Sequence, residues 1–83
     1  MKAKIKINLV KEVLRLADLA QNIESDVMLK HGSYTVDATS ILGIMSLNLS
    51  EPVELIVVEK NINESSLLYK QLQDEGFNIT IEE

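Results

Sequence analysis

Hydrophobic and polar positions alternate strictly at the start of the chain. In residues 2–8, KAKIKIN, the apolar residues Ala3, Ile5 and Ile7 share one side and lysines occupy the other. A period of two is typical of a strand with one buried face. The segment therefore predicts a half-buried strand, with Asn8 placed to cap the element that follows.

The hydrophobic period lengthens to that of a helix after Asn8. The apolar positions are then Leu9, Val10, Val13, Leu14, Leu16, Ala17 and Ala20. This spacing predicts an amphipathic helix that ends near Gln21.

The middle of the chain predicts three more strands. Residues 26–31 and 34–38 flank Gly32-Ser33, and a glycine there suits a tight hairpin turn because it accepts a positive φ. Residues 52–59, PVELIVVE, form the most apolar of the predicted strands. Pro52 stands at the start of that strand, where a missing N–H is tolerated.

The last third of the chain predicts a helix followed by a short C-terminal segment of alternating residues. Asn61 and Glu64 have the spacing of a capping box, and Gly76 marks the expected helix end. The expected buried face of this helix consists of Leu67, Leu68, Gln71 and Leu72. Residues 77–83, FNITIEE, alternate again and predict an edge strand or a frayed tail, of which we favour the strand.

The predicted order of elements is β-α-β-β-α-β-α in a single domain spanning residues 1–83. Four short strands and helices able to cover one face indicate an α+β fold, an open-faced β-sandwich. We expect a four-stranded antiparallel sheet covered on one face by helices, to which residues 77–83 can add a strand.

The segment 37–49, DATSILGIMSLNL, does not fit an ordinary surface helix. Ser40 is placed to cap a short helix, but at ~100° per residue the apolar positions that follow cannot all face one core. We expect Ile41, Leu42 and Met45 to form an exposed recognition face beside Ser40, with Gly43 keeping the helix surface open. The alternative is that loops or a second copy of the chain cover this helix.

Composition and charge exclude several classes of function. The formal charge of −5 argues against nucleic-acid binding. The absence of cysteine excludes disulfides, and no segment approaches the ~20 apolar residues of a membrane span. There is no targeting signal and no metal-ligand spacing. We therefore expect a cytoplasmic protein without cofactor or metal.

Charge is also distributed unevenly along the chain. Residues 1–15 carry five basic residues against one acidic residue, whereas residues 51–83 carry eight acidic residues against two lysines. The two halves are expected to present solvated faces of opposite sign, and the basic face could meet an acidic partner or a phosphate.

The element order and the run Ser40-Ile41-Leu42-Gly43-Ile44-Met45-Ser46-Leu47 resemble the HPr family, the histidine-containing phosphocarriers of the sugar phosphotransferase system. The stretches YTVDATS and PVELIVV extend this resemblance on both sides. In that family a histidine at the start of the first helix accepts phosphate from phosphoenolpyruvate by way of enzyme I. Here the matching stretch is INLVKEVL, with Leu9 and Val10 in that region, so the resemblance implies loss of phosphocarrier activity.

The resemblance further implies a non-enzymatic regulatory or protein-binding module of carbon catabolite regulation. Ser40 matches the regulatory serine that HPr kinase phosphorylates, and Ile41, Leu42 and Met45 match the docking helix. The implied partners are HPr kinase and a transcriptional regulator or metabolic enzyme. Lys11 is the candidate to replace, crudely, the family's missing cation.

Two alternatives stay open. The chain could be a divergent phosphocarrier that uses His31, its single histidine, although a histidine beside Gly32 is more simply a solvated turn residue. It could also be an oligomerising interaction protein unrelated to sugar uptake, with strand edges pairing between copies. We expect a monomer or a weak homodimer.

Overall fold

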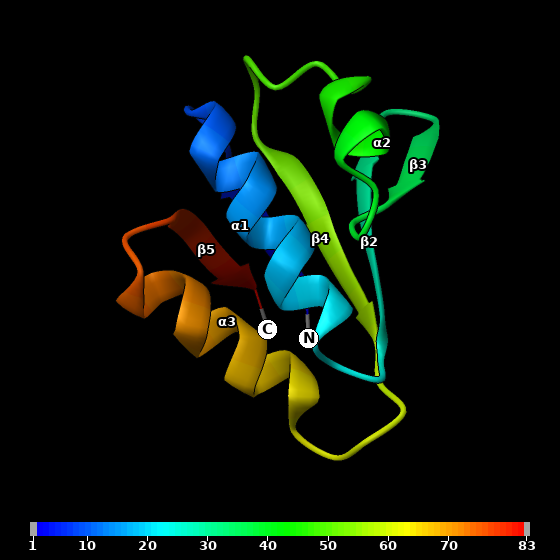
Figure 1. Ribbon diagram of the computed structural model, residues 1–83, viewed down its shortest axis with the longest axis vertical. Helices are drawn as coiled ribbons and strands as arrows, with labels where there is room; N and C mark the ends of the chain where they lie inside the picture. The colour runs from blue at the N-terminus through cyan, green and yellow to red at the C-terminus, as the bar shows by residue number, and fades with distance from the viewer. Residues whose placement is uncertain (1, 83) are drawn as a thin grey trace.

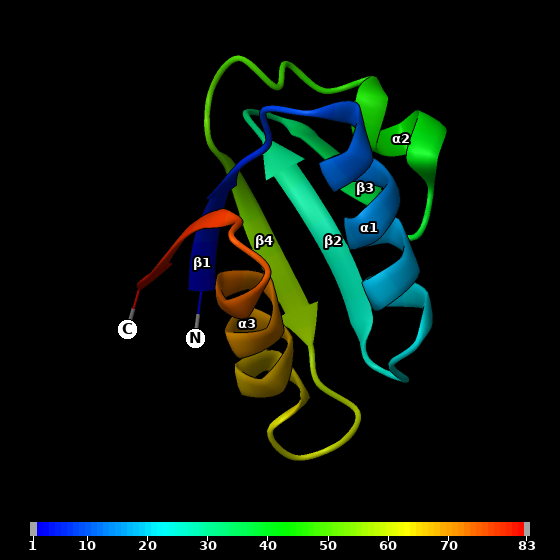
Figure 2. The ribbon, with the colours of Figure 1, turned by 60° about the vertical axis from the view of Figure 1, so that its left-hand side comes forward.

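An antiparallel sheet of five strands forms one layer of the structure, and helices cover one of its faces (Figures 1 and 2). The computed structural model describes residues 2–82. The elements are β1 (Lys2–Lys6), α1 (Val10–Gln21), β2 (Asp26–His31), β3 (Tyr34–Asp37), α2 (Ile41–Met45), β4 (Val53–Val58), α3 (Glu64–Asp74) and β5 (Asn78–Glu82). The α+β sandwich expected from the sequence is confirmed, with β5 as a fifth strand.

The strand order is β3-β2-β4-β1-β5, so β1 lies between β4 and β5. Every neighbouring pair is antiparallel. The β2–β3 hairpin turns at Gly32, whose φ of +61° is the positive value expected there. No helix within residues 2–82 is long and apolar enough to cross a membrane.

One apolar layer lies between the sheet and the helices. Ala3 and Ile5 of β1 and Ile7 just after it are buried in this layer, as their alternation predicts. The strands β2 and β4 add Val27, Leu29, Val53 and Leu55, and the helices add Val13, Leu16, Ala17, Ala20, Ile44, Leu68, Tyr69 and Leu72. Full burial of a leucine or isoleucine side chain contributes about 1.5–3 kcal/mol, so this layer dominates stability.

The last segment is an edge strand. Residues 78–82 pair with residues 2–6 of β1 without a break in register. Gly76 has a φ of +88°, and the N–H of Phe77 donates to the carbonyl of Leu72 at 3.0 Å. These are features of a Schellman helix end, which turns the chain from α3 into β5.

The start of α1 differs from the prediction, because Asn8 does not cap it. Leu9 is the N-cap residue and makes no side-chain cap bond. Glu12 instead places its Oε1 atom where it accepts from the N–H groups of Asn8 and Leu9, at 2.9 and 3.0 Å. A charged acceptor on the third helical residue thus satisfies the N–H groups that precede the helix.

The capping box predicted from Asn61 and Glu64 is wrong. Asn63 precedes α3 in a left-handed conformation, with a φ of +68°. The Glu64 carboxylate accepts from the N–H groups of Glu24 and Ser25 and from the Ser25 hydroxyl, which lowers its pKa. A tertiary bond to the start of β2 has replaced the local cap.

The buried face of α3 is also rotated from the predicted one. Leu67 and Gln71 are exposed, whereas Leu68, Tyr69 and Leu72 are buried together with Ser65. The tyrosine ring supplies more apolar area to the core than Gln71 could, and this sets the orientation of the helix.

A bidentate ion pair joins α1 to the end of α3. Arg15 Nε and Nη2 donate to Glu75 Oε1 and Oε2 at 2.6 and 2.7 Å, and Gln71 also donates to Oε2 at 2.6 Å. The bonds from Arg15, and then the bond from Gln71, lower the pKa of Glu75 to about 2. The carboxylate therefore stays ionised well below its ordinary range.

This ion pair predicts a contribution to acid stability. The pKa of Glu75 is lower in the folded protein than in the unfolded chain, so its contribution is complete above about pH 4.5 and is lost as the pH falls toward about 2. Urea unfolding at a series of pH values should show a smaller acid loss in Glu75→Gln than in the wild type. Equal losses in the two proteins over this window would contradict the assignment.

Candidate functional site

Ser40 caps α2, as the sequence predicts. Its backbone is extended, and its Oγ accepts from the N–H of Gly43 at 3.0 Å. We expected Gly43 to keep the outer surface of the helix open, but the side of Gly43 that would carry a side chain faces Ser40 and Val36. A Cβ there would come within 3.2 Å of the Ser40 side chain and 3.4 Å of Val36, so the glycine makes room for the capping hydroxyl.

The apolar side chains of α2 divide between core and solvent. Ile44 is fully buried, and Leu47 after the helix is buried with it. Ile41, Leu42 and Met45 are 39%, 82% and 50% exposed. The geometry thus leaves the three predicted docking residues open to solvent, while their role in binding a partner stays a prediction.

The start of α1 adds exposed apolar side chains beside α2. Leu9, Val10 and Met45 line one hollow of about 310 Å³, together with Leu49 from the loop after α2. We define the apolar patch as Leu9, Val10 and Met45 of this hollow together with three exposed residues about one helical turn from Val10 or Met45, namely Leu14, Ile41 and Leu42. Sequence reasoning assigned Leu9, Val10 and Leu14 to the apolar helix face, but all three are exposed because the core is filled from Val13, Leu16 and Ala17.

Two charged side chains occupy the loop before α1. The Glu12 carboxylate takes the N–H groups of Asn8 and Leu9, as described above. Lys6 Nζ donates to Asn8 Oδ1, to the Leu49 carbonyl and to the Ile7 carbonyl at 2.8, 3.0 and 3.3 Å. The bonds of Lys6 connect the β1–α1 loop to the α2–β4 loop. The charged groups of both Lys6 and Glu12 are therefore already hydrogen-bonded within the protein.

The structure does not bring Lys11 and Ser40 together. Lys11 lies in the first turn of α1 and lines a hollow with Glu75 and Phe77. Ser40 follows Thr39, whose carbonyl accepts from Gln21 at the other end of α1 at 3.2 Å. Lys11 instead borders the apolar patch through Leu9, which lines the hollows on both sides.

His31 ends β2 at the β2–β3 turn, at the same end of the sheet as the start of α1, because Lys4 of β1 and Lys30 of β2 both lie opposite Glu54 of β4. Its Nε2 lies 3.8 Å from Oε2 of Glu51. A carboxylate therefore lies beside this ring, and it would repel an incoming phosphoryl group. Stabilisation of a transferred phosphoryl group needs the opposite arrangement, with cations or N–H donors around it.

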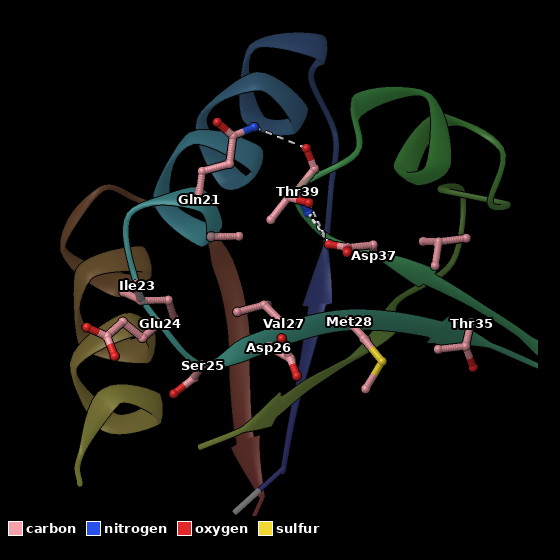
Figure 3. A pocket seen from close by; sticks show the side chains of 12 residues that line it. Gln21, Ile23, Glu24, Ser25, Asp26, Val27, Met28, Thr35, Asp37 and Thr39 are labelled. Carbon is pink, nitrogen blue, oxygen red and sulfur yellow. Dashed lines mark hydrogen bonds between the residues drawn. The ribbon is translucent and has the colours of Figure 1, made fainter. Parts of the chain in front are cut away.

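A further hollow of about 510 Å³ lies between the end of α1 and the strands β2 and β3 (Figure 3). Several of its polar side chains form hydrogen bonds within the protein. Thr39 donates from its N–H and hydroxyl to Asp37 Oδ1 at 2.8 and 2.7 Å, which lowers the pKa of Asp37, and Ser25 bonds to Glu64. Within residues 2–82 no group of three His, Cys, Asp or Glu side chains could hold a metal ion.

The Ser40 cap predicts a measurable loss of stability on substitution. Ser40→Ala removes the acceptor for the Gly43 N–H and should lower the free energy of unfolding by about 1 kcal/mol. Ser40→Asp keeps an acceptor and should cost less. Urea denaturation of the three proteins measures both values, and an alanine variant as stable as the wild type would contradict the cap.

Comparison with known proteins places this geometry in a family. The model of the PTS HPr component phosphorylation site matches residues 11–69. The fold is similar to a solved structure of the histidine-containing phosphocarrier protein from Mycoplasma, with a TM-score of 0.70 and 16% identity over 90% of this chain and 94% of that one. A search of curated proteins finds no match. Because the family model spans most of the chain, the protein belongs to the HPr family of the phosphotransferase system.

Proposed function

We propose that this HPr-family protein acts as a regulatory binding module in place of a phosphocarrier. The observation that carries the proposal is the apolar patch, which exposes Leu9 and Val10 where the family resemblance implies the phosphorylated histidine. An aliphatic side chain has no lone pair with which to attack a phosphoryl group. The protein is accordingly not an enzyme, and it acts through contacts with other cytoplasmic proteins.

The charges near the start of α1 support the loss of phosphate transfer. A helix N-terminus favours an anion, because its N–H groups and dipole attract negative charge. Here Glu12 already brings a carboxylate to the N–H groups of Asn8 and Leu9. A phosphoryl group at this place would meet a like charge, and Lys6 is held by three other acceptors.

The apolar patch has the character of a docking surface. Neighbouring exposed apolar side chains on a small protein commonly mark an interaction site. Met45 adds an unbranched, polarizable side chain that adapts to more than one partner. Lys11 borders the patch and can supply a charged contact at its rim, where such contacts favour encounter more than affinity.

Ser40 is the proposed control point. Its side chain lies at the solvent-exposed start of α2, next to Ile41 and Leu42 of the apolar patch. A phosphate there would add about two negative charges and three acceptor oxygens, which an arginine of a partner can bind. HPr kinase is the proposed modifying enzyme, and a transcriptional regulator or a metabolic enzyme is the proposed reader of the phosphoserine.

Incubation with ATP and HPr kinase tests Ser40 by intact mass. We expect one added phosphate in the wild type and none in Ser40→Ala. An HPr known to be phosphorylated on serine, included in the same assay, shows that the kinase is active. An unmodified wild type beside a modified control would contradict the role of Ser40.

The same reaction tests the apolar patch. Leu42→Ser should lower kcat/KM of HPr kinase for this protein about tenfold, because a side chain central to a docking surface typically contributes 1 kcal/mol or more. Leu67→Ser is the matched control, since Leu67 is also an exposed helical leucine but lies on α3, outside the patch. Equal rates for the two variants would exclude docking through the patch.

A further inference from the structure

The outer edge of the sheet at β5 carries an inference independent of the apolar patch. β5 is the last strand in the order β3-β2-β4-β1-β5, so one of its two edges has no neighbouring strand among residues 2–82. A strand edge presents unpaired N–H and C=O groups that can pair with another chain. Natural proteins block such edges with lysine, proline, a bulge or a very short strand.

β5 contains no lysine, proline or bulge, and its one charged side chain, Glu82, lies at its end. Its sequence is Asn-Ile-Thr-Ile-Glu, and its five residues pair with β1 in an unbroken register. The central Ile-Thr-Ile triplet has high strand propensity. Ile79 and Ile81 are only half-buried although they pack against the core, so apolar area remains at this edge of the helix-covered face.

The opposite edge of the sheet is less suited to pairing. β3 has four residues, one fewer than β5, and each of the two edge strands has a helix packed against it. The carboxylate of Asp37 at the end of β3 is committed to Thr39. The β5 edge is therefore the longer of the two, by one residue.

We propose that β5 pairs antiparallel with β5 of a second copy, joining two sheets into one of ten strands. The sequence of β5 is complementary to itself about Thr80. On the helix-covered face, Ile79 would lie opposite the partner's Ile81. On the open face, Thr80 would lie opposite the partner's Thr80, and Asn78 opposite the partner's Glu82.

Charge placement agrees with this register. Lys2 of β1 lies opposite Glu82 in the β1–β5 register within each copy. The two Glu82 side chains would stand about 14 Å apart, at ~3.4 Å per residue, which exceeds the ~8 Å screening length at physiological salt. The dyad would bring two threonines together instead of two like charges, and such threonine pairs stabilise neighbouring strands.

The dimer is expected to be weak. Five paired residues bury far less than the roughly 1,200 Å² of a standard stable interface. Each copy also carries a formal charge of −5, so salt should strengthen association by screening the repulsion. Sedimentation velocity up to about 1 mM chain should show the average mass rising above 9.3 kDa with concentration, and more steeply in higher salt.

Thr80→Glu tests the register and leaves the monomer intact. The new carboxylate would face Lys4 on β1 within its own copy, but would oppose its equivalent across the dyad. Association should weaken about fivefold or more, as like charges directly opposite each other repel. Thr35→Glu is the matched control, because it adds the same charge to the other edge strand opposite Lys30 and should not weaken association beyond the effect of net charge.

A cysteine substitution gives a second measurement. The chain has no cysteine, so Thr80→Cys places single thiols next to each other at the dyad. Under mild oxidation it should form a disulfide-linked dimer faster than Thr35→Cys. The proposal would be overturned by a wild type that stays monomeric at about 1 mM. Equal effects of the two glutamate variants, or equal oxidation of the two cysteine variants, would also overturn it. So would a dimer that dissociates in Leu42→Asp but not in Thr80→Glu.

Discussion

Burial of one face of one sheet is the constraint on which the rest of the structure depends. A chain of 83 residues can fill a single apolar layer, and α1 and α3 supply most of its cover. The five-residue helix α2 contributes only Ile44 to this layer. Ile41, Leu42 and Met45 then have no interior to enter, so the patch follows from the size of the core.

The same constraint explains why the strands were predictable from the sequence and the starts of α1 and α3 were not. Alternation in residues 2–8 and 77–83 has a period that only a one-sided strand satisfies, and both strands formed. A helix cap, in contrast, depends on which side-chain acceptors lie near the helix start in the folded protein, and these can come from distant parts of the chain. Glu64 bonds to Ser25, 39 residues away in sequence, and no local pattern encodes that distance.

The candidate site was predictable to a similar extent. The exposure of Leu42 and Met45 followed from helical geometry, because apolar residues on every side of a short helix exceed what one core contact can bury. The contribution of Leu9 and Val10 to the same patch was missed, since their spacing matches that of the buried helix face. The signal was Glu12, three residues after Leu9, whose carboxylate fixes the start of α1. Placement of Lys11 away from Ser40 needed the helix packing itself.

The central claim is that a docking surface has replaced the phosphoryl-transfer site of an HPr. Incubation with enzyme I and phosphoenolpyruvate, followed by intact mass under conditions that preserve phosphohistidine, tests it most directly. We expect no added phosphate on this protein while an ordinary HPr in the same tube is modified. An acid-labile phosphate that disappears in His31→Ala would contradict it and would make the protein a carrier with a relocated histidine.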